Sequence, residues 1–128
     1  MFAGRALFHA TAAAVFLQLV VGGLLTFNFI KPELHIVLGL IVFILAIACL
    51  IVSFVSKPSF RPVRIASIAL VVLMLVQIIL GFAALGTHSD AISWTHFVNA
   101  MIVYGVAMSG NFMAVRWDQI RLAQSKSP

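Results

Sequence analysis

The stretch that decides the fold is 76-VQIILGFAALGTHSDAISWTHFVNA-100. It contains the end of one apolar segment, a short turn, and a histidine that enters a second apolar segment. The same arrangement occurs once before, in 17-LQLVVGGLLTFNFIKPELHIVLGL-40. A repeated stretch of this length indicates a duplicated structural unit, so we predict that one helical hairpin occurs twice in the chain.

The polar residues fix the register of the repeat. A shift of 59 residues aligns three pairs: Arg5 with Arg64, Gln18 with Gln77, and Gly22 with Gly81. Beyond the turn, which is two residues longer in the second copy, a shift of 61 residues aligns His35 with His96 and Gly39 with Ala100. Polar side chains are costly at membrane depth, so these matches carry more weight than matches between leucines and valines.

The composition is that of a membrane protein. Of the 128 residues, 63% are hydrophobic and 9% are charged, whereas a soluble domain has roughly 25% charged residues. Runs of about 20 apolar residues can span a membrane, and four such runs cover residues 6–29, 34–56, 64–85 and 94–115. We predict an all-α membrane protein with a single domain over residues 1–128. It is a four-transmembrane-helix bundle built from the two repeated hairpins, followed by a tail (116–128) that is helical for only a turn or two.

The basic residues predict the orientation. Seven of them lie at the N-terminus, between the second and third segments, or in the tail: Arg5, Lys57, Arg61, Arg64, Arg116, Arg121 and Lys126. Only Lys31 lies on the other side. By the positive-inside rule both termini are cytoplasmic, in a multi-pass protein of the plasma membrane. The net charge of +5 follows from this topology, so no nucleic-acid partner is needed to explain it. The expected partner is the lipid bilayer.

The first apolar segment also has features of a secretory signal peptide, because Arg5 precedes an apolar run. We favour a retained membrane helix, since the run continues to Phe29, no small-x-small cleavage pattern follows it, and its removal would destroy the first repeat. The single cysteine, Cys49, is interpreted as a small packing residue.

Glutamine and glycine share a helix face in both repeats, at Gln18 and Gly22 and again at Gln77 and Gly81. In membrane helices small residues usually mark close helix contacts, and a glutamine usually bonds to a neighbouring helix. The alternative is that both pairs face a large planar ligand, with glycine giving clearance and glutamine a hydrogen bond. The sequence leaves both interpretations open.

The aligned histidines stand near the starts of the second and fourth segments. Pro32 and Glu33 suit a first helical turn, which places His35 in the first or second turn. One turn after each histidine the residue is small. Diagonal helices of a bundle leave a central gap, and imidazoles from facing helices can hold a haem iron there. We therefore predict that His35 and His96 bind one haem towards the outer face.

Two alternatives remain for this pair. Both histidines could simply cap helices at the membrane interface. A bare zinc or copper ion is less favoured, because no carboxylate or thiolate completes a ligand set unless Glu33, His88 or Asp90 takes part.

The other two histidines have no partner in the repeat. His9 follows Arg5 by one turn near the cytoplasmic interface, where we expect it to bond to a backbone carbonyl, a lipid phosphate or water. His88 lies in the outer turn and is expected to be exposed, with contact to a haem propionate as the alternative.

The repeated phrase resembles one four-helix half of the haem A synthase family, whose larger members join two such halves. The residues that carry the resemblance are Arg5, Gln18, Gly22, His35 and Gly39, repeated as Arg64, Gln77, Gly81, His96 and Ala100. The resemblance covers nearly the whole chain. It implies a b-type haem, or haem O and haem A as substrate and product, held by His35 and His96. The cofactor would be lined by Gln18, Gly22, Gly39, Gln77, Gly81 and Ala100.

The chain departs from the family pattern beside its histidines. In the family a glutamate typically stands three residues before the first histidine and an arginine follows it, whereas here Glu33 precedes His35 by two residues and Ile36 follows. Phe97 follows His96, and the outer cysteine pair of many members is missing. Glu33 stays the candidate catalytic residue.

Two classes of function follow. In the first, the chain is a haem A synthase-like oxidoreductase that converts haem O to haem A for a terminal oxidase. In the second, it is a non-enzymatic b-type cytochrome, or a small haem-bearing subunit of a respiratory complex, which passes electrons to or from quinone. A packing subunit without haem is a third interpretation. The expected partners are quinone, a haem-containing terminal oxidase or its assembly factors, and a second copy of this chain.

Overall fold

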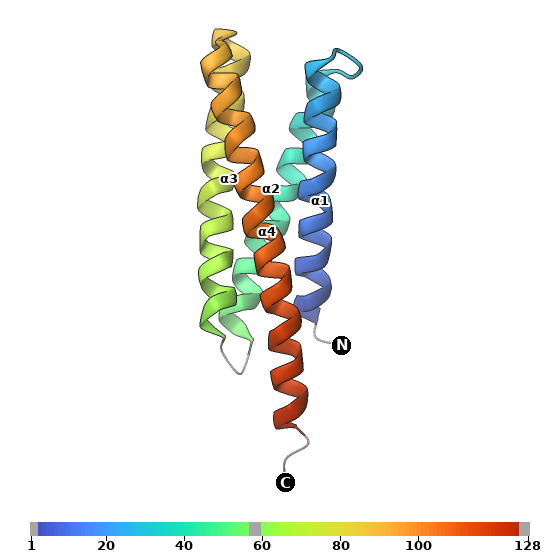
Figure 1. The fold of residues 1–128 in the computed structure, drawn as a ribbon, viewed down its shortest axis with the longest axis vertical. Helices are drawn as coiled ribbons and strands as arrows, with labels where there is room; N and C mark the ends of the chain where they lie inside the picture. The colour runs from blue at the N-terminus through green and yellow to red at the C-terminus, as the bar shows by residue number, and fades with distance from the viewer. Residues whose placement is uncertain (1–2, 57–59, 126–128) are drawn as a thin grey trace.

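The computed structural model describes residues 3–56 and 60–125, and every regular element in this part of the chain is an α-helix (Figure 1). The four helices are α1 (Ala3–Thr26), α2 (Pro32–Val55), α3 (Arg61–Thr87) and α4 (Asp90–Gln124). Each is long and apolar enough to cross a membrane. This confirms the predicted all-α fold with four membrane-compatible helices.

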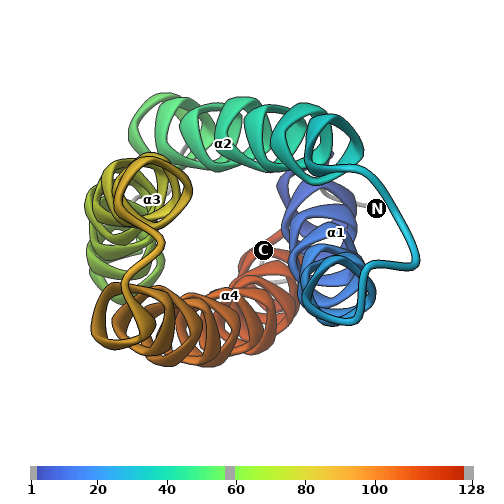
Figure 2. The ribbon, with the colours of Figure 1, turned by 90° about the horizontal axis from the view of Figure 1, so that it is seen from above.

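The helices form a ring in chain order, as the view along the bundle shows (Figure 2). Each helix packs against the two that flank it in the ring, α1 against α2 and α4, and α3 against α2 and α4, so α2 and α4 are diagonal. The end that carries the α1–α2 and α3–α4 connections is called the loop end, and the end where α1 begins and α4 ends is called the terminal end. The two hairpins lie farther apart at the loop end (Figure 1).

Local sequence explains where the helices start and stop. Proline stands in the first turn of both α2 and α3, where its missing N–H is not needed. Asn28 and His88 have positive φ angles of 59° and 52°, a left-handed conformation that ends a helix. The first helix therefore stops at Thr26, three residues earlier than predicted. Lys57 and Lys126, two of the basic residues used to predict the orientation, lie outside the described residues.

The core lies between the four helices. Val42 and Ala46 of α2, which continue the face of His35, and Val103 and Ala107 of α4, which continue the face of His96, are buried. The same cluster is completed from α1 and α3 by Ala12, Val15, Leu70 and Met74. Large apolar side chains remain exposed on the outside, with Ile44 at 64%, Ile79 at 67% and Phe112 at 73%. Such a surface suits a lipid environment better than water.

The fourth helix differs most from the prediction. It continues without a break to Gln124, so most of the predicted tail is helical. The extension is packed: Trp117 is 1% exposed and belongs to a second cluster with Phe8, Val63 and Ala114. Its ring also stacks on Phe60, with 6.4 Å between ring centroids. Trp94 and Trp117 stand at opposite ends of the predicted fourth span, where the sequence predicts an interfacial aromatic belt. Trp94 is 66% exposed and can take that position, whereas the burial of Trp117 contradicts the prediction for it.

The aligned arginines both lie at the terminal end, and each reaches the end of a neighbouring helix. Arg5 Nη1 is 3.7 Å from Oδ2 of the buried Asp118 on α4. The guanidinium of Arg64 lies 4.5 Å from the ring centroid of Phe54 on α2. The repeat thus preserves the position of the arginine but not its partner.

The single cysteine is buried in α2. Its Sγ lies 3.3 Å from Oγ1 of Thr11 on α1, and it belongs to the second cluster. These contacts agree with its interpretation as a packing residue.

Candidate functional site

Two histidines meet between the diagonal helices near the loop end. His35 comes from the fourth position of α2, and His96 comes from the second turn of α4. Their ring centroids are 6.1 Å apart, and the ring planes are inclined by 68°. The sequence repeat therefore brings two imidazoles together from opposite sides of the ring of helices. We call them the histidine pair.

In the first hairpin, Gln18 of α1 holds the imidazole of His35. The side-chain Nε2 of Gln18 donates to the backbone oxygen of His35 at 2.9 Å, and it lies 3.3 Å from Nε2 of the ring. A Cβ at Gly39 would lie only 3.0 Å from the same Gln18 nitrogen. The space that we expected beside the imidazole is therefore occupied by the Gln18 amide, and Gly39 is needed to admit it.

In the second hairpin, Gln77 of α3 holds His96, but a third residue takes part. Gln77 Nε2 lies 3.1 Å from Nε2 of His96. Asn99 Nδ2 donates to Gln77 Oε1 at 2.6 Å and to the backbone oxygen of Leu73 at 3.1 Å. Sequence reasoning missed Asn99. The sequence feature that could have identified it is an amide side chain in an apolar helix, three residues after the histidine, because a polar side chain at membrane depth needs a partner.

Glycine allows both imidazoles to approach the neighbouring helix. A Cβ added to Gly22 would lie 3.1 Å from Cε1 of His35, and a Cβ added to Gly81 would lie 3.1 Å from Cε1 of His96. Both distances are shorter than an ordinary carbon–carbon contact of about 3.5–4.0 Å. The two aligned glycines therefore make the same contact in each hairpin, and that contact is with the histidine.

The glycine contact gives a testable prediction. Replacing glycine by alanine inside a helix normally stabilises it by roughly 0.5–1 kcal/mol, and Gly23 has no atom within 4 Å of an added Cβ. We expect Gly23→Ala to raise the free energy of unfolding by about that amount. Gly22→Ala should instead lower it by about 1 kcal/mol, because the His35 ring must move. Detergent unfolding followed by circular dichroism measures both; equal gains in the two variants would contradict the close contact.

The remaining predicted residues lie around the pair or away from it. Ala100 is half-buried one turn after His96, and Glu33 is exposed in the first turn of α2. A catalytic role for Glu33 stays a prediction. His88 ends α3 and is exposed, as expected. His9 lies near the terminal end with its Nδ1 3.1 Å from Oδ1 of Asn111, so its partner is a side chain of α4 and not the carbonyl, phosphate or water that we expected.

The two imidazoles of the histidine pair suit a metal whose other ligands come from a cofactor and not from the protein. Within residues 3–56 and 60–125, no group of three or more His, Cys, Asp or Glu side chains gathers to hold a metal ion. The two imidazoles lie 6.1 Å apart between ring centroids. They would be the protein ligands of a haem, whose porphyrin supplies the other nitrogens to the iron.

Buried polar atoms without a partner also mark this region. Four buried side-chain atoms have no hydrogen-bond partner among the described residues: Nδ1 of His35, Nδ1 of His96 and Oε1 of Gln18 lie here, and Nε of Arg64 lies at the terminal end. Most buried polar atoms in proteins are paired, so three unpaired atoms around one pair of rings favour a ligand site over simple helix capping.

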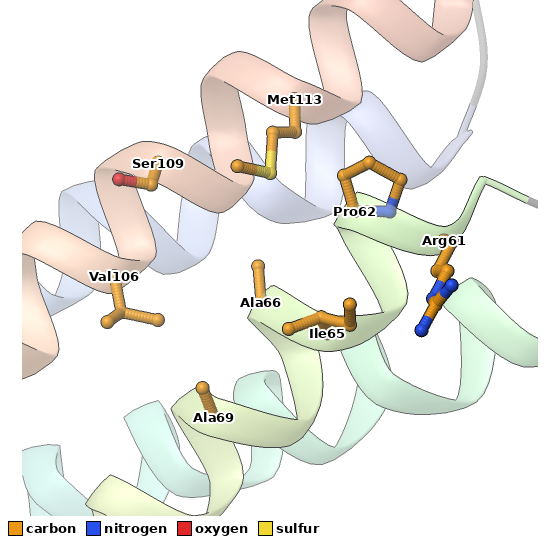
Figure 3. Close-up of a pocket in the computed structure, with 8 residues that line it drawn as sticks. All are labelled: Arg61, Pro62, Ile65, Ala66, Ala69, Val106, Ser109 and Met113. Atoms are coloured by element: carbon orange, nitrogen blue, oxygen red, sulfur yellow. The ribbon is translucent and has the colours of Figure 1, made fainter.

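An apolar surface pocket of about 420 Å³ lies elsewhere, between α3 and α4 (Figure 3). It is lined by Arg61, Pro62, Ile65, Ala66, Ala69, Val106, Ser109 and Met113. It includes no residue of the histidine pair or of the glutamines that hold it, so it is separate from the candidate site.

No family model, curated protein or solved structure matches the chain. Function is therefore inferred from the residues and geometry of the site.

Proposed function

We propose that this chain is an integral membrane redox protein that binds one haem between His35 and His96. The observation that carries the proposal is the approach of two imidazoles from diagonal helices to a ring separation of 6.1 Å. Each Nε2 contacts a glutamine amide, and a bound haem would take these two nitrogens in place of the amides.

The ligand set favours electron transfer. When bound, haem supplies a one-electron couple. With His35 and His96 both holding it, the haem would exchange electrons rather than bind a substrate at its iron. The protein's part is to orient the two imidazoles before haem binds, through Gln18 and Gln77, and to let the helices approach closely at Gly22 and Gly81. We therefore favour a b-type cytochrome or a small haem-bearing subunit that exchanges electrons with quinone or with a respiratory complex.

The bundle lies across the plasma membrane in this proposal. The terminal end carries the described arginines Arg5, Arg61, Arg64, Arg116 and Arg121, and the positive-inside rule then makes that end cytoplasmic. The histidine pair is placed towards the outer face. The exposed apolar surface of the helices supports contact with lipid.

The second candidate function is conversion of haem O to haem A for a terminal oxidase, by oxidation of a methyl group of the porphyrin. The repeated phrase that resembles haem A synthase supports it. Glu33 is the candidate catalytic residue because it stands two residues before His35 and is exposed at the loop end of α2.

The test is a reduced-minus-oxidised visible spectrum of the purified chain, with identification of the extracted haem as its pyridine haemochrome. We expect a sharp low-spin spectrum. Protohaem alone, together with no gain of haem A in a host that makes haem O, supports the electron carrier. Production of haem A in that host supports the enzyme. A chain that takes up no haem when haem is supplied in excess contradicts the proposal.

A further inference from the structure

The two hairpins hold their glutamines differently, and two substitutions within the repeat explain why. Gly39 aligns with Ala100, and Leu38 aligns with Asn99. In the first hairpin the absence of a Cβ at Gly39 lets the Gln18 amide reach the backbone oxygen of His35. In the second hairpin alanine occupies that space, and the Gln77 amide is held by Asn99 instead.

The direction of each hydrogen bond in the second hairpin can be deduced from one backbone atom. The carbonyl oxygen of Leu73 can only accept, so the Asn99 atom that faces it at 3.1 Å is the NH₂ group. The same NH₂ group lies 2.6 Å from the Gln77 side chain, so the Gln77 atom at that contact is its oxygen. The other end of the amide, which faces His96 Nε2 at 3.1 Å, is then an NH₂ donor.

This series of hydrogen bonds determines which ring nitrogen of His96 carries the proton. An amide NH₂ cannot accept a hydrogen bond, so Nε2 of His96 must accept and must carry a lone pair. In a neutral imidazole the proton then lies on Nδ1. The tautomer that results is the one in which Nε2 is ready to bind a metal. Asn99 is 8% exposed, which protects the two bonds that it donates from competition with water.

We propose that Asn99 is a positioning residue that acts through Gln77 to hold His96 in the Nδ1–H tautomer, in which the Nε2 lone pair accepts from the Gln77 amide. The first hairpin reaches the same state by another route, because the backbone oxygen of His35 itself fixes the donor end of Gln18. The value of this tautomer for haem ligation rests on the proposed function, but the tautomer itself is a property of the haem-free chain.

The experiment is ¹⁵N NMR of the full chain labelled at histidine, prepared without haem in lipid bilayers at a pH where the imidazoles are neutral. The two ring nitrogens of a neutral histidine give separate protonated and unprotonated signals, so the tautomer is observed directly. The signals of His35 and His96 are assigned by their loss in His35→Gln and His96→Gln. We expect both residues to be Nδ1–H in the unmodified chain.

The deciding variant is Asn99→Leu, which introduces the residue found at the aligned position of the first hairpin. It frees the Gln77 amide to rotate, so His96 should become a mixture of both tautomers while His35 stays Nδ1–H. The matched control is Asn111→Leu, which makes the same substitution in the same helix beside His9. It should leave His96 unchanged.

Either of two results would overturn the proposal. One is an Nε2–H signal for His96 in the unmodified chain, a result that does not depend on the folding of any variant. The other is a His96 signal that stays wholly Nδ1–H in Asn99→Leu while the His35 signals show that the bundle is intact. Haem titrated into the same unmodified sample tests the proposed function separately, because failure to bind haem leaves the tautomer result standing.

Discussion

His35→Ala and His96→Ala should each weaken haem binding by a factor of about 100 or more. Loss of an outer partner of a metal ligand already costs roughly 10–100-fold in affinity, and these variants remove a ligand itself. The sharp low-spin spectrum should be lost in both, because the two rings lie on opposite sides of one site. The measurement is haem content per chain and the reduced-minus-oxidised spectrum after purification in parallel.

The other two histidines supply the controls. His9 bonds to Asn111 towards the terminal end, and His88 is exposed where α3 ends, so His9→Ala and His88→Ala should keep the haem. Added imidazole separates a missing ligand from a misfolded chain, since a small ring can occupy the space left by His35→Ala and restore the low-spin spectrum. A haem spectrum that survives in either His35→Ala or His96→Ala would refute the ligand assignment.

The histidine pair could be predicted because the repeat relates residues that are far apart in the sequence, which the hydrophobic pattern of a single helix cannot do. Two hairpins related by duplication place equivalent residues at equivalent depths, and α2 and α4 are diagonal in a ring of four helices in chain order. His35 and His96 therefore had to face each other once both faced inward. The small residue after each histidine and the buried stripe below it indicated the inward face correctly.

The hydrogen bonds around the pair could not be predicted in the same way. Gln77 contacts His96 directly, and Asn99 holds the other end of its amide. Two differences between the repeats accompany the change: Asn99 stands where the first hairpin has Leu38, and Ala100 stands where it has Gly39, which leaves room for the Gln18 amide. The aligned repeat suggested equivalent roles, and the structure shows different partners.

Burial at the terminal end was also hidden from the sequence. In a chain whose outer surface is apolar, lipid-facing and core-facing positions have similar residues, so periodicity does not separate them. Trp94 and Trp117 both lie near the predicted ends of one span, where aromatic residues are common. Only the contacts of the extended α4 with α1 and α3 show that Trp117 is inside the bundle.

Trp117→Ala should lower the free energy of unfolding by about 3–5 kcal/mol, the range for removing a fully buried large aromatic ring. The ring is 1% exposed, it packs against Phe8 and Val63, and it stacks on Phe60. Its removal therefore leaves a cavity that joins all four helices at the terminal end. The last turns of α4 should loosen first, because the neighbouring Asp118 then loses the packing that orients it towards Arg5.

The matched control is Trp94→Ala, in the same helix at the other end. Trp94 is 66% exposed and its ring contact is with Phe97 of its own helix, so the loss should be less than about 1 kcal/mol. Unfolding by sodium dodecyl sulfate in mixed micelles, followed by circular dichroism, measures both variants. A loss of the same size in both would mean that Trp117 acts as an interfacial anchor like Trp94, and that α4 beyond residue 115 adds little to the stability of the bundle. A large loss for Trp117 alone would show that the terminal end is a packed core that holds the two hairpins together.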